Sequence, residues 1–256
     1  MIGGSPLSKF RRALEQLNVL DAAIHRWADT EPCRVVHERD PQTGEQSLTV
    51  YVTAQPSDAI FQLLIGEIVH SLRTSLDHIA YRLAINVHGI DPPPNEATTE
   101  FPAMTGDAHQ LDSELLKKIA PKKLMPPDLY AAIEGLQPYH GGKNDALALI
   151  HNLDNLDKHR FPPVVAGNAE IGSIHIGELQ GQITKPIRVG ALEHGAALIA
   201  FIPDPGTHVD VEADFKPSIA FGNGSPVRPG ELVYPLLYDA VAFVQNTAFP
   251  ALEPFV

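Results

Sequence analysis

The longest regular pattern of apolar residues lies between residues 57 and 88. Apolar side chains recur there at spacings of three and four residues, which places them on one side of a helix. They are Phe61, Ile65, Ile68, Leu72, Leu76, Ile79 and Leu83. The pattern predicts one long amphipathic helix whose apolar side faces a core.

Shorter patterns predict the elements on either side of this helix. A helix over 8–28 and a hairpin with strands at 34–38 and 47–53 precede it, because residues 40–45 contain the Pro and Gly of a turn. Helical patterns follow it at 108–119, 127–136 and 145–158. Beyond residue 161, short runs rich in Val, Ile and Ala predict antiparallel strands at 163–169, 171–179, 183–193, 197–202, 209–215 and 218–221, and a last helix at 229–247.

These elements predict an α+β fold. Its core is a helical bundle over about 57–160, joined by the N-terminal helix and hairpin, a C-terminal antiparallel sheet and a final helix. We expect a single domain over 1–256, because no Gly/Ser linker separates the parts. The alternative is a division into a mainly helical part, 1–160, and a mainly β part with a terminal helix, 161–256.

Composition and charge exclude several classes of protein. The chain has 256 residues, a formal net charge of −12 and one cysteine, Cys33. The negative charge argues against a DNA-coating protein or a binder of anionic membranes. One cysteine excludes an intramolecular disulfide and a multi-cysteine metal site. No apolar run approaches the roughly 18 residues of a membrane span, so we expect a cytoplasmic protein with no membrane partner.

The polar side of the long helix carries side chains that exchange protons near neutral pH. It presents Glu67, His70, Thr74, Asp77 and Tyr81, with Arg73 and His78 at its edges. A solvated helix face normally carries Lys and Glu, but this one has two His, one Arg and no Lys. The long helix is therefore the first place to look for a site.

Arg73 and His78 belong to the segment RTSLDH, in which four residues separate them. This segment resembles the R-x(4-6)-H motif of the HEPN superfamily, whose ribonuclease members carry it on a helix of a helical bundle. The resemblance implies metal-independent cleavage of RNA at a homodimer interface, with Arg73 holding the phosphate and His78 moving a proton. The alternative is that Arg73 pairs with Asp77 one turn later, as an ordinary i,i+4 contact.

A second charged segment, NLDNLDKHR, covers residues 152–160. The helical wheel places Asp157 beside the apolar face, where a charge needs a partner such as Arg73, His70 or His78. In a ribonuclease, Asp157 would orient the imidazole or hold Arg73. Alternatively, the basic residues at its end complement the helix dipole.

Three further residues of this segment are candidate substrate contacts: Asn155, Lys158 and His159. A dimer would collect Lys158 and Arg73 from both chains into one groove. The segments LRTSLDH and NLDNLDKHR together are also similar to a broad group of bacterial proteins without an assigned activity. That similarity supports pairing the two segments in the fold.

Three functional hypotheses follow. The first is a HEPN-like endoribonuclease of the toxin or phage-defence type, without a cofactor. The second is a non-catalytic interaction module in which Arg73, Asp77, His78 and Asp157 form a buried network. The third is a mononuclear metal site made by His70, His78, Asp157 and His159.

Overall fold

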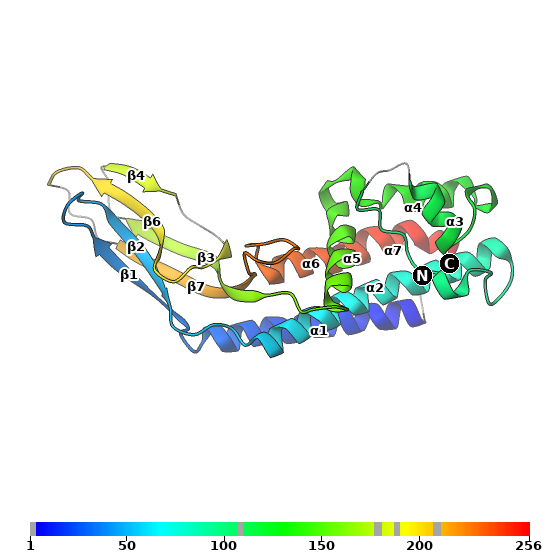
Figure 1. Cartoon of the computed structure of the whole chain (residues 1–256), viewed down its shortest axis with the longest axis horizontal. Helices are drawn as coiled ribbons and strands as arrows, with labels where there is room; N and C mark the ends of the chain where they lie inside the picture. The colour runs from blue at the N-terminus through cyan, green and yellow to red at the C-terminus, as the bar shows by residue number, and fades with distance from the viewer. Residues whose placement is uncertain (1–3, 107–109, 177–180, 187–189, 207–210) are drawn as a thin grey trace. The chain divides into compact units, whose positions relative to one another are not determined.

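The computed structural model describes residues 4–106, 110–176, 181–186, 190–206 and 211–256. Helices and antiparallel strands are both present, which confirms the α+β class (Figure 1). The chain divides into two compact units, each assembled from separate segments. The helical unit comprises Met1–Val19, Leu63–Phe161 and Pro235–Val256, and the sheet unit comprises Leu20–Gln62 and Pro162–Tyr234.

The unit boundaries at Val19/Leu20 and Gln62/Leu63 fall within two long helices, α1 (Ser5–Ala28) and α2 (Asp58–His88). Within the helical unit they are antiparallel neighbours. Arg12 lies 3.6 Å from Glu67, and the Ser75 hydroxyl donates to the Pro6 carbonyl at 2.8 Å. Every apolar residue of the predicted stripe on α2 is at most 3% exposed, which confirms the pattern that predicted this helix.

The other helices of this unit are short, because prolines and glycines interrupt the chain between them. They are α3 (Leu111–Lys118), α4 (Pro127–Gly135) and α5 (Asp145–Asp157). Each agrees with a predicted helix to within a few residues, except that positions 108 and 109 lie outside the described residues. Gly141 and Gly142 both have positive φ, which allows the tight loop before α5.

The final helix begins later and ends later than predicted. It comprises α6 (Val233–Phe243), a π-helical turn (Val244–Ala248) and α7 (Phe249–Leu252). Leu232 bridges to a strand instead of joining the helix. Pro250 has no N–H and its ring crowds the preceding turn, and the wider π-helical turn lets the helix continue.

Two antiparallel sheets make up the sheet unit. The first has the order β1 (Cys33–Arg39), β2 (Gln46–Val52), β6 (Ala196–Pro203), β4 (Gly181–Lys185). The second has the order β5 (Gly190–Ala191), β3 (Val164–Ile176), β7 (Val211–Phe221). The predicted hairpin is therefore confirmed, and its second strand also pairs with β6.

Two pairs of strands predicted as separate are each continuous. The runs predicted at 163–169 and 171–179 both belong to β3, and those at 209–215 and 218–221 both belong to β7. Positions 177–179 and 209–210 of these runs fall outside the described residues. One of two shifts of register in the β3–β7 pairing, between Asn168 and Glu170, lies beside Pro217, which cannot donate to the ladder.

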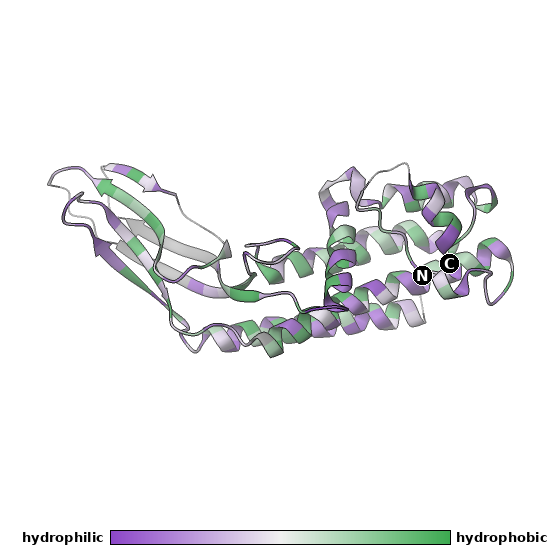
Figure 2. Ribbon diagram, in the orientation of Figure 1, coloured by the Kyte–Doolittle hydropathy of each residue, from purple (hydrophilic) through white to green (hydrophobic). Residues whose placement is uncertain are grey.

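The interior of the sheet unit is apolar, and most of β6 is green in the hydropathy colouring (Figure 2). Its core cluster consists of Cys33, Val50, Val52, Ala166, Leu192 and Leu198. Burial raises the pKa of the Cys33 thiol to about 11, so the thiol stays protonated at neutral pH. Among the described residues, no helix is both long and apolar enough to cross a membrane.

Candidate functional site

Arg73, the first predicted site residue, lies inside the helical unit and is 3% exposed. Its Nη2 is 3.1 Å from Asp77 Oδ1 and 3.1 Å from Glu100 Oε2. The expected i,i+4 contact with Asp77 is thus confirmed, and Glu100 is a second partner that the sequence did not indicate. Nη1 of the same guanidinium is buried and has no hydrogen-bond partner.

The two carboxylates around Arg73 differ in environment. Burial raises the pKa of Asp77, against the charge of Arg73 and the N–H of Phe101, which donates to Oδ1 at 2.8 Å. Burial acts on Glu100 in the same direction, but the Lys118 ammonium, 2.6 Å from Oε1, and the charge of Arg73 hold the pKa of Glu100 below its usual value. Arg73, Asp77, Glu100 and Lys118 form what we call the arginine network.

His78 does not belong to this network. Five residues along a helix correspond to a turn of about 140°, which places His78 on the face that also carries Ser75 and Arg82. Ser75 bonds to Pro6, and Arg82 lies against Gly4, so this face is turned to the start of α1. His78 Nδ1 is buried without a hydrogen-bond partner. Among the described residues, no hydrogen bond joins Arg73 to His78, the Arg and His of the R-x(4-6)-H segment.

A different imidazole has the geometry of an acid–base group. His70, whose side chain is 61% exposed, has its Nδ1 3.1 Å from Oδ1 of Asp154. The Asp154 side chain is 3% exposed, and its Oδ2 lies 2.7 Å from the Lys158 ammonium. A buried carboxylate thus fixes one ring nitrogen of a solvent-exposed imidazole, an arrangement that orients a histidine for proton transfer.

His70 and Lys158 were candidates from the sequence, whereas Asp154 was not. Asp154 lies four residues after Ile150 and seven after Leu147, which are both fully buried, and this spacing is the sequence signal that predicts an inward-facing Asp154. Asp157 lies closer to the centre of the apolar face on the helical wheel, but it is the last residue of α5 and stays half-buried. Solvent reaches the helix end, so the inward charge is Asp154.

Asp157 packs against Gly66 of α2. A side-chain carbon at position 66 would collide with the Asp157 carboxylate. Burial raises the pKa of Asp157, the negative charge of Asp154 raises it further, and His70 opposes both. Its Oδ1 is buried and has no hydrogen-bond partner, and the side chains that act on its charge among the described residues are Asp154 and His70.

Asn155 is exposed on α5, and His151, one turn earlier on the same helix, is half-buried. The Asn155 amide donates to Nε2 of His151 at 3.0 Å. Burial lowers the pKa of His151, the charges of Arg73 and Lys118 lower it further, and Glu100 and Asp154 oppose them. His151, which the sequence did not indicate, therefore lies within electrostatic reach of both the arginine network and Asp154.

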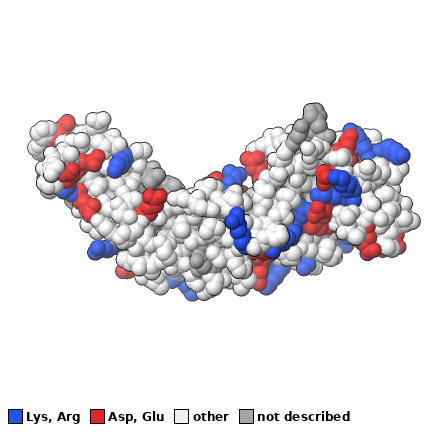
Figure 3. Space-filling view, in the orientation of Figure 1, with Lys and Arg blue, Asp and Glu red and all other residues white. Residues whose placement is uncertain are grey.

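These contacts place two charged clusters on α2, α3 and α5, with His151 coupled to both. We call His70, Asp154 and Lys158 the histidine cluster. No family model, curated protein or solved structure matches this chain. On the face drawn in Figure 3, basic and acidic side chains lie interspersed over the helical elements.

The predicted metal ligands are not assembled into a site. His70 pairs with Asp154, His78 faces the start of α1, and His159 is exposed beyond the end of α5. Among the residues that the structure describes, no group of three or more His, Cys, Asp or Glu side chains is placed to hold a metal ion. The clusters described here can instead exchange protons and bind anions.

Proposed function

We propose that the helical unit is a HEPN-like, metal-independent endoribonuclease of the toxin or phage-defence type whose acid–base group is His70 and not His78. The contact between exposed His70 and buried Asp154 supports this assignment most directly. It leaves the imidazole Nε2 for a substrate, apart from a long contact of 3.5 Å to the Thr74 hydroxyl. Lys158, on the same carboxylate, supplies a cation beside it.

The reaction uses the RNA ribose as its internal nucleophile. Neutral His70 takes the proton of the 2′-hydroxyl through Nε2, and the 2′ oxygen forms its bond to phosphorus. The bond from phosphorus to the 5′ oxygen breaks, and that oxygen takes a proton from water. Asp154 stabilises the imidazolium that forms, and Lys158 lies where it can balance the charge of the phosphate.

The formal net charge of −12 opposes RNA binding, so the substrate must be held by local cations. We place the enzyme in the cytoplasm, and we propose that it acts as a homodimer, as the HEPN resemblance implies. A dimer would double the number of Lys158 side chains along one strand of RNA.

Incubation of the purified chain with end-labelled RNA in excess chelator tests the proposal. His70→Gln should reduce the cleavage rate by roughly 100-fold or more, the contribution typical of a general acid or base. His78→Gln is the matched control and should cleave like the parent, because His78 has no place in the histidine cluster. Cleavage that survives in His70→Gln and disappears in His78→Gln would refute this assignment.

The second candidate is the non-catalytic interaction module, and the arginine network supports it. Arg73 is buried and already bonded to two carboxylates, as expected of a residue that holds α2 to the segment around Glu100. If the parent cleaves no RNA and Arg73→Met lowers the melting temperature strongly, this second function replaces the first. Cleavage by the parent that depends on His70 excludes it.

A further inference from the structure

The Glu100 side chain occupies the position of an anion between two cations. One carboxylate oxygen is 3.1 Å from Arg73 Nη2, and the other is 2.6 Å from Lys118 Nζ. The two cationic side chains are 4% and 16% exposed, while that of Glu100 is 42% exposed. The cations are therefore largely buried, and the anion that joins them is the more exposed partner.

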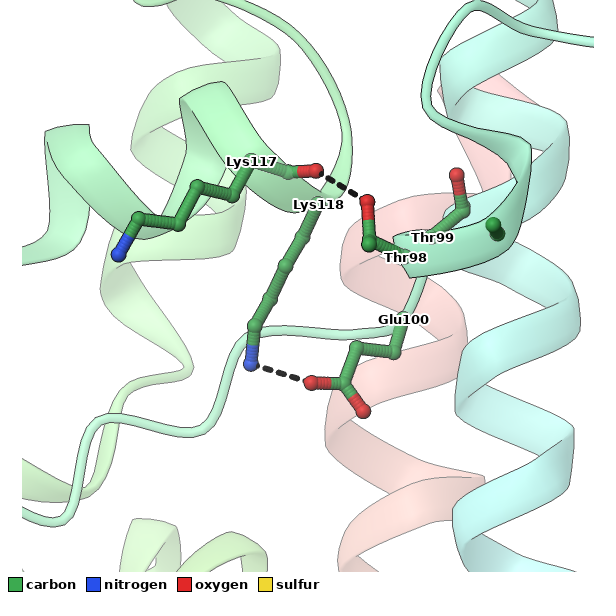
Figure 4. A pocket seen from close by; sticks show the side chains of 6 residues that line it. Thr98, Thr99, Glu100, Lys117 and Lys118 are labelled. Carbon is green, nitrogen blue, oxygen red and sulfur yellow. Dashed lines mark hydrogen bonds and ion pairs between the residues drawn. The ribbon is translucent and has the colours of Figure 1, made fainter.

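An open pocket of about 430 Å³ adjoins this carboxylate. It is lined by Ala97, Thr98, Thr99, Glu100, Lys117 and Lys118. Figure 4 shows the Lys118 ammonium meeting the Glu100 carboxylate, while the Lys117 ammonium points away from them. The volume of the pocket falls in the range of pockets that hold small ligands.

Arg73 has unused capacity for an anion. Its Nη1 is buried and has no hydrogen-bond partner, although buried donors are nearly always satisfied. A guanidinium presents parallel N–H groups that match two oxygens of a phosphate. Glu100 engages Nη2 with one oxygen and gives its other oxygen to Lys118, so it leaves the second arm of the fork unfilled.

We propose that Arg73 and Lys118 form a binding site for the phosphate group of a small phosphate monoester, and that Glu100 occupies this site until the ligand displaces it. A phosphate monoester carries more charge than a carboxylate and has three terminal oxygens, enough to reach Nη1, Nη2 and Lys118 together. The remainder of the ligand would lie in the pocket. This site involves neither His70 nor cleavage, so it stands apart from the proposed reaction.

The backbone around Glu100 need not move for the exchange. Phe101 N–H is held by Asp77 at 2.8 Å, and the Thr99 hydroxyl donates to the Asn95 carbonyl at 2.8 Å. The exchange is a rotation of the half-exposed Glu100 side chain, which releases Lys118 and one contact of Arg73 Nη2, while Asp77 keeps its own contact with Nη2. Glu114, 3.4 Å from the Lys118 ammonium, would keep that ammonium in place.

Phosphate titration of the Glu100→Gln variant tests the proposal. Calorimetry with inorganic phosphate and with a nucleoside 5′-monophosphate should show affinities about tenfold or more above those of the parent, because a neutral amide competes poorly for two cations. Glu114→Gln is the matched control, since it removes the same charge beside Lys118 without touching Arg73. Its affinities should stay within about threefold of the parent.

Two results would overturn the proposal. In one, neither probe binds Glu100→Gln more tightly than the parent. In the other, Glu114→Gln gains as much affinity as Glu100→Gln, so that net charge alone explains the effect. Adding Lys118→Met to Glu100→Gln should abolish the gain, and urea denaturation of each variant checks that it is folded. Phosphate binding is measured without RNA, so its outcome is independent of whether the parent cleaves RNA.

Discussion

Asp157 and Glu100 are both carboxylates near the polar side of α2, yet their pKa values shift in opposite directions. Two cations bond to Glu100 and lower its pKa, so its ionised form adds stability above the ordinary value of 4.5, and that stability is lost as the pH falls through the folded-state pKa. Burial and Asp154 raise the pKa of Asp157, so Asp157 favours folding below the ordinary value of 3.8, and that contribution is lost as the pH rises through the folded-state pKa.

Asp157→Asn should therefore stabilise the protein relative to the parent by an amount that grows as the pH rises from 3.8 through the folded-state pKa of Asp157 and then levels off. Asparagine keeps the size of the side chain, but it has no charge that would be buried against Gly66 or repelled by Asp154. Urea denaturation of both proteins across the acid range measures the difference in free energy of unfolding. A difference that stays constant with pH would mean that the Asp157 carboxyl has the same pKa in the folded and unfolded chain.

Arg73→Met should destabilise the protein by about 2–4 kcal/mol, since it leaves the Asp77 carboxylate without its cation and Glu100 with Lys118 alone, while keeping most of the side-chain volume. This range begins lower than the roughly 3–5 kcal/mol for a fully buried pair because Asp77 and Glu100 are partly exposed. Arg12→Met is the control: Arg12 pairs with Glu15 and Glu67 at the surface, and its loss should cost no more than about 1 kcal/mol. Equal losses in chemical denaturation would contradict the structural role of Arg73.

At the scale of elements, the contact between α2 and α5 depends on a glycine in a helix. Gly66→Ala would ordinarily favour a helix by up to about 1 kcal/mol. Here the new methyl group meets the Asp157 carboxylate, so we expect a net destabilisation of about 1–3 kcal/mol. The double variant with Asp157→Ala should recover most of this loss in thermal denaturation.

Gly135→Ala is the control. Nothing lies within 4 Å of the new carbon there, so this variant should be neutral or stabilising. A double variant no more stable than Gly66→Ala alone would rule out the proposed collision.

Local patterns in the sequence predicted the elements well because their causes are local. The period of α2 fixed its buried side, and the i,i+4 spacing predicted the pair of Arg73 and Asp77. The partners of those elements depend on distant residues. Glu100 and Lys118 reach Arg73, and β2 pairs with β6, through loop paths that no periodicity encodes. The contact of His70 with buried Asp154 likewise joins α2 to α5, and the predicted site residues His78 and Asp157 each have a buried side-chain atom without a hydrogen-bond partner.

At the scale of the whole molecule, segments of the helical unit and of the sheet unit alternate along the chain. The boundary between Phe161 and Pro162 lies where the sequence pattern changes from helix to strand. The helical unit also includes the last segment, Pro235–Val256. Within that unit the ring centroids of Phe10 and Phe249 are 5.2 Å apart, and the Asn86 amide donates to the Phe255 carbonyl at 2.9 Å. The C-terminal helices also supply buried side chains, Leu237, Ala240, Val241, Val244 and Leu252.

A fragment that ends at residue 161 should therefore lack fixed tertiary structure, because it exposes the apolar surface that α6 and α7 cover. Adding a peptide with residues 229–256 in trans should restore native side-chain packing in the helical unit. Near-ultraviolet circular dichroism and the dispersion of amide signals in NMR spectra measure this recovery. The same peptide with Val244→Asp is the control and should fail, since it places a charge at a fully buried position. Cooperative unfolding of the fragment alone, unchanged by either peptide, would show that residues 1–161 fold without the C-terminal helices.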